Sequence, residues 1–473
     1  MFNSKNILAE TPRRQPEGLR CGFAKLGLCC TRCPQGPCRI DPFGYGASLG
    51  ACGAGADNLA GRSTLEKVLA GSALYLEESW QLETAVAATI PAGKLSLWKD
   101  RGVWPGPAGA EMVSALAQVA RPGSSRREEL ELKAIRVALA AFYAGLAQQE
   151  KLYNDSLGLT SLTTVPAGPG LLSPEVVSIV IDGSRPYLAA AIKKQIAATA
   201  TPIDNYGARG IQLVAAGREG DYLAWRLGLP YLGNEAVLRE TMAAGVVDLV
   251  AIADTSGVLL PFQLTGSRIK GVNLNEIKPD GSNWEGLAQE LIRQALAAHQ
   301  EGPVISSNYA FKPHSLLTGW QQDLVEVLAG EALAKEMRGI ALLFLCEGTG
   351  TVNLARQLLE EGFLVLAGGC GLDELIAAGY MGQVFHLGGC RGLVRGLAVA
   401  AAVQGKLPLK VYWPVIGCSR AYPGIATVIA HGAEVFLASQ MANFISPGTA
   451  GLFGASCHSG SAAEEVAAGW TTS

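Results

Sequence analysis

The sequence predicts an α/β protein in which a helical N-terminal part is followed by two blocks of alternating strands and helices. Three observations support this class. Six cysteines crowd into the first 60 residues, helical patterns follow up to about residue 165, and from residue 176 short apolar runs ending in glycine alternate with helical stretches. That alternation is typical of strand-helix-strand units around a buried parallel sheet.

Length and charge limit the class of protein. At 473 residues the chain is too long for one core, and a prior of about 150 residues per domain predicts roughly two to four domains. Its net charge of −3 and pI near 6.1 provide no basic field to attract nucleic acid or an anionic membrane. No apolar run approaches the roughly 20 residues that cross a bilayer, and the N-terminus lacks a secretory signal. We therefore expect a cytoplasmic protein with neither a nucleic-acid nor a membrane partner.

The first domain is predicted to span residues 1–172. After the cysteine-rich segment, residues 60–165 read mostly as helices, and a Pro/Gly/Ser-rich stretch at 104–125 is expected to interrupt them. Residues 163–175, TTVPAGPGLLSPE, are predicted to form a linker.

Two sheet-forming domains are predicted after this linker, over residues 173–300 and 301–473, with a polar segment near 299–320 between them. The buried strands of the first are expected at 176–183, 210–217 and 246–254. Those of the second are expected at 339–346, 363–370, 383–390 and 411–418.

Each of the last four runs ends in a cysteine: Cys346, Cys370, Cys390 and Cys418. The carboxyl ends of parallel strands lie along one edge of an open sheet, where ligands bind. The pattern therefore predicts a metal site built from four sequence-distant thiolates. The alternative is that these are small buried apolar residues, since free cysteine is among the most buried residue types.

A cysteine cassette lies nearer the N-terminus. The spacing Cys30-x2-Cys33-x4-Cys38, followed by Cys52, places four thiolates on a Gly/Pro-rich loop. Four cysteines of this kind hold a [4Fe-4S] cluster. Zinc also accepts four thiolates, but two further cysteines beside the cassette favour iron and sulfur.

Those two cysteines, Cys21 and Cys29, supply only two ligands. A two-fold symmetric dimer could complete a shared cluster with a pair from each subunit. The alternative is a pair of free structural thiols. Thiols stay reduced in the cytoplasm, so the 11 cysteines of the chain favour metal binding over a disulfide framework.

The whole segment CGFAKLGLCCTRCPQGPCRIDPFGYGASLGACG (21–53) resembles the N-terminus of the anaerobic nickel-iron carbon monoxide dehydrogenases. The resemblance implies a relay [4Fe-4S] cluster at Cys30, Cys33, Cys38 and Cys52, and an intersubunit [4Fe-4S] or [2Fe-2S] cluster at Cys21 and Cys29. It also implies a homodimer, a helical N-terminal domain followed by two Rossmann-like domains, and a ferredoxin-like electron donor or acceptor.

The active site departs from the family pattern. One histidine and five cysteines hold the family's nickel-iron-sulfur cluster, and Cys346, Cys370 and Cys390 match three of them. The family's His-Gly-His-x-Pro segment resembles residues 182–186 here, which begin with Asp182 and contain no histidine. Its Cys-Cys-Thr-Gly-Asn-Glu segment corresponds to residues 217–221, and its remaining strand-end cysteine falls near Ala251. We therefore expect no nickel.

The proton-carrying groups of the family also differ here. A histidine-studded helix follows the relay cluster in the family, whereas residues 71–84 contain no histidine. Arg420 stands where the family has a lysine, and arginine remains charged where lysine can release a proton. These losses weigh against carbon monoxide chemistry.

Oxygen ligands and one extra thiol could replace what is lost. Cys418 lies where the related hybrid-cluster proteins, which reduce hydroxylamine, use a glutamate as iron ligand. Together with Asp182, Glu219 and Asp221 it would suit an iron-sulfur or iron-sulfur-oxygen cluster, although each carboxylate could instead be a solvated loop charge. His386 is expected either to donate to the cluster sulfurs or to be a satisfied core histidine.

The function predicted first is reduction of a small inorganic substrate such as hydroxylamine, with Arg420, His386, Glu219 and Asp182 as candidate catalytic residues. One alternative is carbon monoxide/carbon dioxide interconversion at a rearranged cluster. The other is a non-catalytic electron-transfer protein whose strand-end cluster is closed by thiolates.

Overall fold

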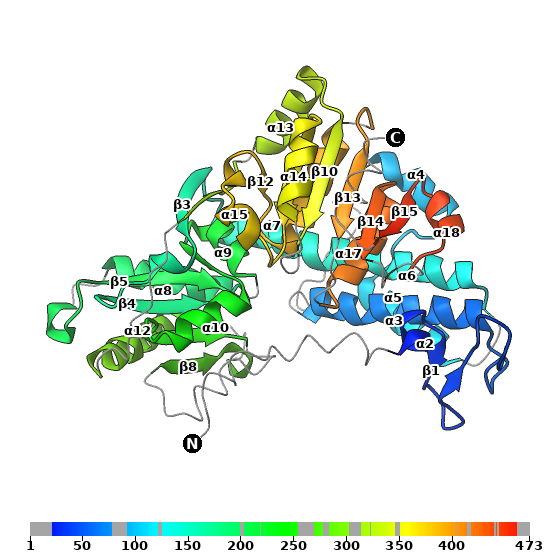
Figure 1. Ribbon diagram of the computed structural model, residues 1–473, viewed down its shortest axis with the longest axis horizontal. Helices are drawn as coiled ribbons and strands as arrows, with labels where there is room; N and C mark the ends of the chain where they lie inside the picture. Colours follow the sequence, from blue (N-terminus) through cyan, green and yellow to red (C-terminus); the bar gives the residue numbers. More distant parts are fainter. Residues whose placement is uncertain are drawn as a thin grey trace. The chain divides into compact units, whose positions relative to one another are not determined.

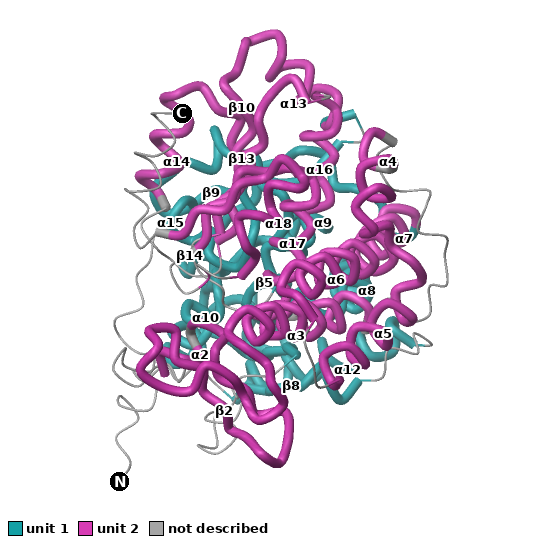
Figure 2. Tube along the Cα trace, turned by 90° about the vertical axis from the view of Figure 1, so that its right-hand side faces the viewer, with its two compact units in different colours: residues 1–13, 156–324, 367–392 teal, residues 14–155, 325–366, 393–473 magenta. Residues whose placement is uncertain are grey.

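A computed structural model describes residues 21–77, 92–121, 125–198, 203–217, 219–253, 269–277, 283–301, 314–321, 323–345, 351–403, 405–413, 418–438, 441 and 444–460. The chain divides into two compact units, each built from several segments (Figure 2). Unit 1 contains residues 1–13, 156–324 and 367–392, and unit 2 contains residues 14–155, 325–366 and 393–473. In the described ranges, no helix combines the length and the apolar character that a bilayer span requires.

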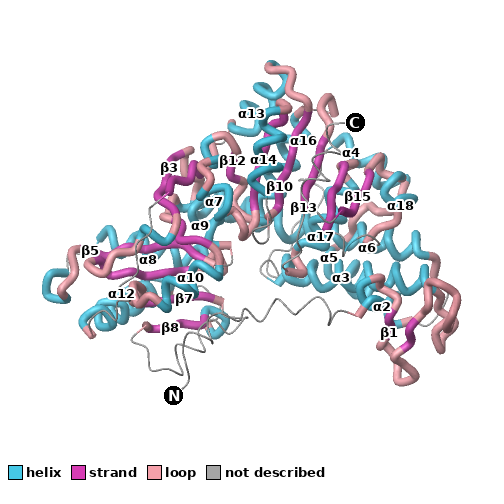
Figure 3. Tube along the Cα trace, in the orientation of Figure 1, coloured by secondary structure: helices cyan, strands magenta, loops and turns pink. Residues whose placement is uncertain are grey.

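Both helices and mainly parallel sheets are present, which confirms the predicted α/β class (Figure 3). The division into domains at residues 172 and 300 remains a prediction, because the two units are each assembled from separated stretches of chain.

The cysteine cassette at the start of unit 2 has little regular structure. It contains helix α2 (Gly22–Lys25) and two short strands, β1 (Cys29–Cys30) and β2 (Cys38–Arg39), which pair antiparallel. A small apolar cluster of Leu28, Cys30, Ile40, Ala54 and Leu59 holds it together.

The helices of unit 2 follow the cassette, as predicted (Figure 1). They are α3 (Ala56–Glu77), α4 (Ala92–Asp100), α5 (Ala108–Ala120), α6 (Arg127–Ala141), a π-helical turn (Phe142–Ala147) and α7 (Gln148–Leu157). Gly61 lets α3 approach α6 closely, since a Cβ there would stand 3.0 Å from the Leu130 side chain.

Helix α5 corrects the expectation that residues 104–125 interrupt the helices. Pro107 occupies its N-cap and Arg121, which precedes Pro122, its C-cap. Proline is tolerated at the start of a helix and just beyond its end. The residues between them are mostly good helix formers, so the prolines set the limits of α5 instead of breaking it.

The sheet of unit 1 has seven strands in the order β8-β7-β4-β5-β6-β3-β9. The bounds are β3 (Thr163–Ala167), β4 (Val176–Ile181), β5 (Gly210–Ala216), β6 (Tyr231–Gly233), β7 (Leu249–Ile252), β8 (Lys270–Asn273) and β9 (His314–Thr318). All neighbours pair parallel except β3 and β9, which pair antiparallel. After β4 the chain adds β5 and β6 on one side of that strand, and then β7 and β8 on the other. A topological switch point therefore lies between β4 and β7.

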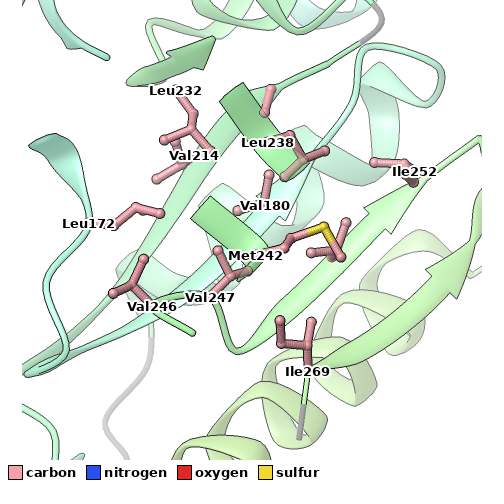
Figure 4. Close-up of a cluster of buried hydrophobic side chains, with 12 residues drawn as sticks. Leu172, Val180, Val214, Leu232, Leu238, Met242, Val246, Val247, Ile252 and Ile269 are labelled. Carbon is pink, nitrogen blue, oxygen red and sulfur yellow. The ribbon is translucent and has the colours of Figure 1, made fainter. Parts of the chain in front are cut away.

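Helices and apolar side chains complete this unit. The helices are α8 (Pro186–Ala198), α9 (Gly220–Leu227), α10 (Glu235–Ala243) and α12 (Trp284–Gln300). Val180 of β4, Val214 of β5 and Leu238 of α10 belong to one buried cluster (Figure 4). The predicted strands of this block therefore form its core.

The linker expected at residues 163–175 was a wrong prediction, because its first five residues form strand β3. Val165 and Ala167 are buried whereas Thr163, Thr164 and Pro166 are exposed, so the segment alternates as a strand does. Proline and glycine in the sequence hid this pattern. Strand β9 pairs with β3, so part of the polar segment near 299–320 also belongs to the first sheet.

The other sheet has six strands in the order β12-β11-β10-β13-β14-β15, which is the Rossmann order. The bounds are β10 (Gly339–Phe344), β11 (Phe363–Gly368), β12 (Phe385–His386), β13 (Leu409–Trp413), β14 (Glu434–Ala438) and β15 (Ser456–Gly460). Its accompanying helices are α13 (Leu324–Ala334), α14 (Thr351–Glu360), α16 (Leu393–Ala402), α17 (Ala421–Ala430) and α18 (Pro447–Gly451). Helix α15 (Asp373–Ala377), which follows β11 in the chain, belongs to unit 1 and contacts β9.

Three of the four predicted runs form full strands in this sheet, but residues 383–390 contribute only the two-residue strand β12. The reason is Gly388 and Gly389, which both have positive φ and turn the chain before Cys390.

A half-buried histidine, His431, joins three helical elements of unit 2. The Tyr143 hydroxyl of the π-helical turn lies 3.0 Å from His431 Nε2, and Lys94 Nζ of α4 donates to the His431 carbonyl at 2.8 Å. Trp98 of α4 packs edge-on against the imidazole. Burial, and secondarily the Lys94 charge, lower the pKa of His431 to about 3, so this ring stays neutral at physiological pH.

Candidate functional site

The cassette brings several of its cysteines together through strand pairing. Cys30 and Cys38 are directly opposite in the β1-β2 ladder, so their side chains share one face. Cys33 lies in the connecting loop, where a Cβ on Gly36 would meet the Cys30 carbonyl at 3.0 Å. The Ala51 N–H donates to Cys38 Sγ at 3.4 Å, which places the loop that carries Cys52 beside Cys38.

Cys29 is adjacent to Cys30 in β1, and successive strand residues point to opposite faces. Cys21 is exposed at the start of α2, and the backbone N–H of Ala24 lowers the pKa of its thiol. Cys29 and Cys30 therefore face different directions, which suits their assignment to different clusters; that assignment stays a prediction.

Arg32 is a functional candidate that the sequence analysis missed. Its guanidinium donates to Cys30 Sγ at 3.4 Å and forms an ion pair with Glu66 of α3. N–H donors on cysteine sulfur stabilise the thiolate and tune the potential of an iron-sulfur cluster. Its position between Cys30 and Cys33 was the available signal.

The cassette fits a [4Fe-4S] cluster by the chemistry of its donors: four thiolates on a tightly folded loop, with N–H groups directed at two of the sulfurs. Among the described residues, no three His, Cys, Asp or Glu side chains are grouped to hold a single metal ion. Cube ligands bind four different irons and so stand farther apart than the ligands of one ion.

In unit 1, Asp182 lies directly after β4, at the switch point of the sheet. One carboxylate oxygen accepts the N–H of Ser184 at 3.0 Å, and the other accepts the N–H of Ala253 at 2.7 Å. Burial is the main cause that raises the pKa of Asp182 to about 6, even though these hydrogen bonds lower it. Asp182 thus ties the end of β4 to the end of β7.

Glu219 is held in a buried ion pair. Its carboxylate accepts a hydrogen bond from Arg391 Nε at 3.0 Å, and both side chains are at most 5% exposed. The Arg391 guanidinium also lies 5.3 Å from the centre of the Tyr222 ring, within cation-π range. Glu219 has left-handed backbone (φ 54°), and its carbonyl lies where a Cβ on Gly183 would be 2.1 Å away, so only glycine fits at position 183.

His386 connects two further residues of the same unit. Its Nδ1 lies 2.9 Å from the Thr318 hydroxyl, and its Nε2 lies 3.4 Å from Asp221 Oδ2, which is long for a hydrogen bond. The imidazole is buried. A Cβ on Gly389 would stand 3.2 Å from Asp221 Oδ1, so the same carboxylate also packs against the turn before Cys390.

Residues 386–391, which we call the Cys390 turn, are therefore held against the first turn of α9 through His386, Gly389 and Arg391. Cys390 is buried and Cys370 half-buried, each just beyond a strand end. The sequence analysis missed Arg391, Thr318 and Tyr222.

Cys418 and Arg420 belong to unit 2, where α3 supports their loop. The Tyr75 hydroxyl donates to the Arg420 carbonyl at 2.9 Å. A Cβ on Gly71 would be 2.1 Å from the Ser419 carbonyl, so glycine is needed one turn earlier on α3. The histidine-free helix predicted at 71–84 thus begins beside Cys418, although its residues 78–84 lie outside the described part of the chain.

The four strand-end cysteines are not all placed together. Cys370 and Cys390 are in unit 1 and Cys418 is in unit 2, while Cys346 lies outside the described residues. Their convergence on one cluster stays a prediction.

A family model described as "Prismane/CO dehydrogenase family" matches residues 28–88 and 77–447, which is most of the chain. The chain belongs to this family. That result confirms the resemblance seen in the sequence and makes the protein an iron-sulfur oxidoreductase by family.

Individual relatives agree with this membership. The chain is 24% identical to the carbon monoxide dehydrogenase of Rhodospirillum rubrum over 90% of this chain and 81% of that protein. It is 23% identical to carbon monoxide dehydrogenase 1 of Carboxydothermus hydrogenoformans over 88% of this chain and 81% of that protein. Its fold is similar to that of carbon monoxide dehydrogenase IV from Carboxydothermus hydrogenoformans, with a TM-score of 0.84, 20% identity and coverage of 95% and 93% of the two chains.

The sequence analysis matched the family's missing ligands to Asp182, to the segment that contains Glu219 and to a position near Ala251, and this matching stays a prediction. Asp182 and Glu219 are buried and already bonded to protein partners. The geometry favours a supporting role for both carboxylates over direct metal binding.

Proposed function

We propose that this family member reduces a small inorganic substrate such as hydroxylamine at a nickel-free iron-sulfur or iron-sulfur-oxygen cluster. Cys346, Cys370, Cys390 and Cys418 would hold that cluster. The observation that carries the proposal is the engagement of Asp182 and Glu219 with protein donors, at the positions matched to the family's missing soft ligands. Because both carboxylates are engaged by protein donors, these positions supply none of the soft ligands that nickel favours, and the remaining thiolates suit iron and sulfur.

The reaction would be NH2OH + 2e⁻ + 2H⁺ → NH3 + H2O, in which the N–O bond breaks. The bound cluster would supply the electrons. A ferredoxin-like partner would reduce the cassette, and a homodimer would complete the cluster at Cys21 and Cys29. Arg32 supports the electron-carrying role of the cassette, because its guanidinium faces Cys30 Sγ.

His386 is the residue best placed to hold a proton in unit 1. Thr318 on Nδ1 and Asp221 on Nε2 fix the orientation of its ring. Arg420 would contribute a fixed positive charge and not a proton, because its guanidinium stays protonated.

A second candidate is carbon monoxide/carbon dioxide interconversion. It is favoured by the names of the relatives above, which are carbon monoxide dehydrogenases. The third is electron transfer without catalysis.

Metal analysis and turnover of the anaerobically purified protein separate these functions. We expect iron without nickel, and hydroxylamine-dependent oxidation of a reduced dye that falls at least tenfold in Cys418→Ala. Stoichiometric nickel with carbon monoxide-dependent dye reduction would establish the second function. Iron without turnover of either substrate would leave the third.

A further inference from the structure

Two buried polar atoms near Cys370, in unit 1, have no hydrogen-bond partner in the part of the chain that the structure describes. The Tyr231 hydroxyl and Asp221 Oδ1 make no hydrogen bond within the described residues, and both side chains are fully buried. Tyr231 begins β6 and Asp221 lies in the first turn of α9, where Gly220 would place a Cβ 3.5 Å from the Tyr231 ring. Buried polar groups normally have a partner, so a group left unpaired calls for a bound molecule.

A second carboxylate lies beside these atoms. Asp373 Oδ2, at the start of α15, accepts the N–H of Asn234, which directly follows β6, at 3.2 Å. Burial first, and then the Asp221 charge, raise the pKa of Asp373 to about 7. Burial and the charges of Asp373, Asp221 and Cys370 raise the pKa of Tyr231 well above its ordinary value. These groups therefore share one environment, which we call the Tyr231 cluster: Tyr231, Asp221 and Asp373.

The Tyr231 cluster has acceptors and negative charge but little positive charge. Within the described ranges, neither Asp221 nor Asp373 forms an ion pair with a lysine or arginine, and the His386 imidazole lies 3.4 Å from Asp221 Oδ2. A buried carboxylate needs a proton or a cation. The raised pKa of Asp373 lets a proton compensate that acid, but water on the unpaired acceptors would leave the charge of Asp221 uncompensated.

We propose that the Tyr231 cluster binds a small monovalent nitrogen cation of the ammonium class. Such a cation offers several N–H donors, which match the Tyr231 hydroxyl oxygen, Asp221 Oδ1 and the Asp373 carboxylate. Its single charge balances one of the two acids. The further assignment to protonated hydroxylamine as substrate and ammonium as product rests on the proposed function, whereas the cation site does not.

Thermal unfolding of the anaerobic holoprotein tests the cation site, because a ligand that binds only the native state raises the melting temperature by mass action. The probe is ammonium chloride, compared with sodium chloride at equal ionic strength. We expect ammonium to raise the melting temperature more than sodium does. Tyr231→Phe and Asp373→Asn should each weaken the apparent affinity for ammonium at least tenfold. Asp204→Asn, an exposed acid in the same unit, should leave it unchanged.

A crystal of the unaltered protein soaked in rubidium chloride provides a measurement that does not depend on the variants folding. Rubidium has a radius close to that of ammonium, and we expect its anomalous peak between the Tyr231 hydroxyl and the two carboxylates. Equal stabilisation by sodium and ammonium, or water alone at this position, would overturn the proposal. Ammonium binding without hydroxylamine turnover would support the site and refute only the proposed function.

Discussion

The cysteine cassette and the Cys390 turn contribute to the same proposed electron path but are built in opposite ways. The cassette takes its ligands from residues 30–52, on two short strands and loops, and Cys33 and Cys52 are exposed. The Cys390 turn is held by buried side chains, and Arg391 is 172 positions from its partner Glu219. We therefore expect the cassette, which has only a small apolar cluster of its own, to gain order from its bound metal, whereas the turn depends on packing.

Removing a cassette thiolate should have the largest effect. In Cys38→Ser we expect loss of one cluster, with a decrease of about four irons per chain and loss of its EPR signal in the reduced protein. The Cys390 turn should be unaffected, because its contacts lie in unit 1.

The matched control is Cys457→Ser, a thiol of β15 for which no ligand role is proposed. Iron content that is unchanged in Cys38→Ser, or equally reduced in the control, would contradict the assignment of Cys38 to the relay cluster.

Breaking the Arg391–Glu219 pair tests whether buried side chains hold the Cys390 turn in place. Arg391→Ala should lower the free energy of unfolding by roughly 3–5 kcal/mol, because it leaves a buried carboxylate unpaired. Adding Glu219→Gln should recover part of that loss in a double-mutant cycle measured by denaturant unfolding.

The exposed pair Lys194–Glu285, at 72% and 62% exposure, is the control, and its removal should leave the free energy of unfolding nearly unchanged. Additive effects at Arg391 and Glu219 would show that the two side chains do not support one another.

Gly389→Ala probes the contact between the Cys390 turn and Asp221. Gly389 has a φ of 69°, and a methyl group would stand 3.2 Å from Asp221 Oδ1. The positive φ alone should lower the free energy of unfolding by about 1–2 kcal/mol. Gly379→Ala, at a φ of 78° with no atom within 4 Å of the added Cβ, carries the same backbone cost without the contact, and equal losses in both variants would refute the contact.

The smallest expected effect is a pH dependence of the unfolding free energy, which arises from His431 in unit 2. His431 has its pKa lowered to about 3, against about 6.5 in the unfolded chain. The unfolded state therefore binds the extra proton below pH 6.5, and stability falls as pH decreases from 6.5 toward 3. The slope from this residue should be at most about 1.4 kcal/mol per pH unit. His431→Gln should reduce the dependence of the unfolding free energy on pH between pH 6.5 and 5.5. An unchanged slope would show that His431 keeps its ordinary pKa in the folded protein.

The sequence predicted the parts of this protein that depend on local spacing. The cassette and the apolar strands β4, β5, β10 and β11 follow from residues close together in the chain. Strand β3 was missed because Pro166 and Gly168 resemble linker residues, although pairing with β9 makes the segment a strand.

The pairing of distant side chains could not be predicted in the same way. No periodicity links Glu219 with Arg391 or Thr318 with His386, because sheet topology alone brings them together. Asp182 and Glu219 were interpreted as potential metal ligands from their position in a family motif. Their hydrogen bonds to Ala253 and Arg391 became visible only in the structure.

Anomalous-scattering maps of the anaerobic holoprotein at the iron and nickel absorption edges would show which metals the strand-end cysteines bind. We expect iron, and no nickel, bound by Cys370 and Cys390 together with Cys346 and Cys418. Nickel at these cysteines, or sulfurs packed among apolar side chains with no metal between them, would contradict this expectation.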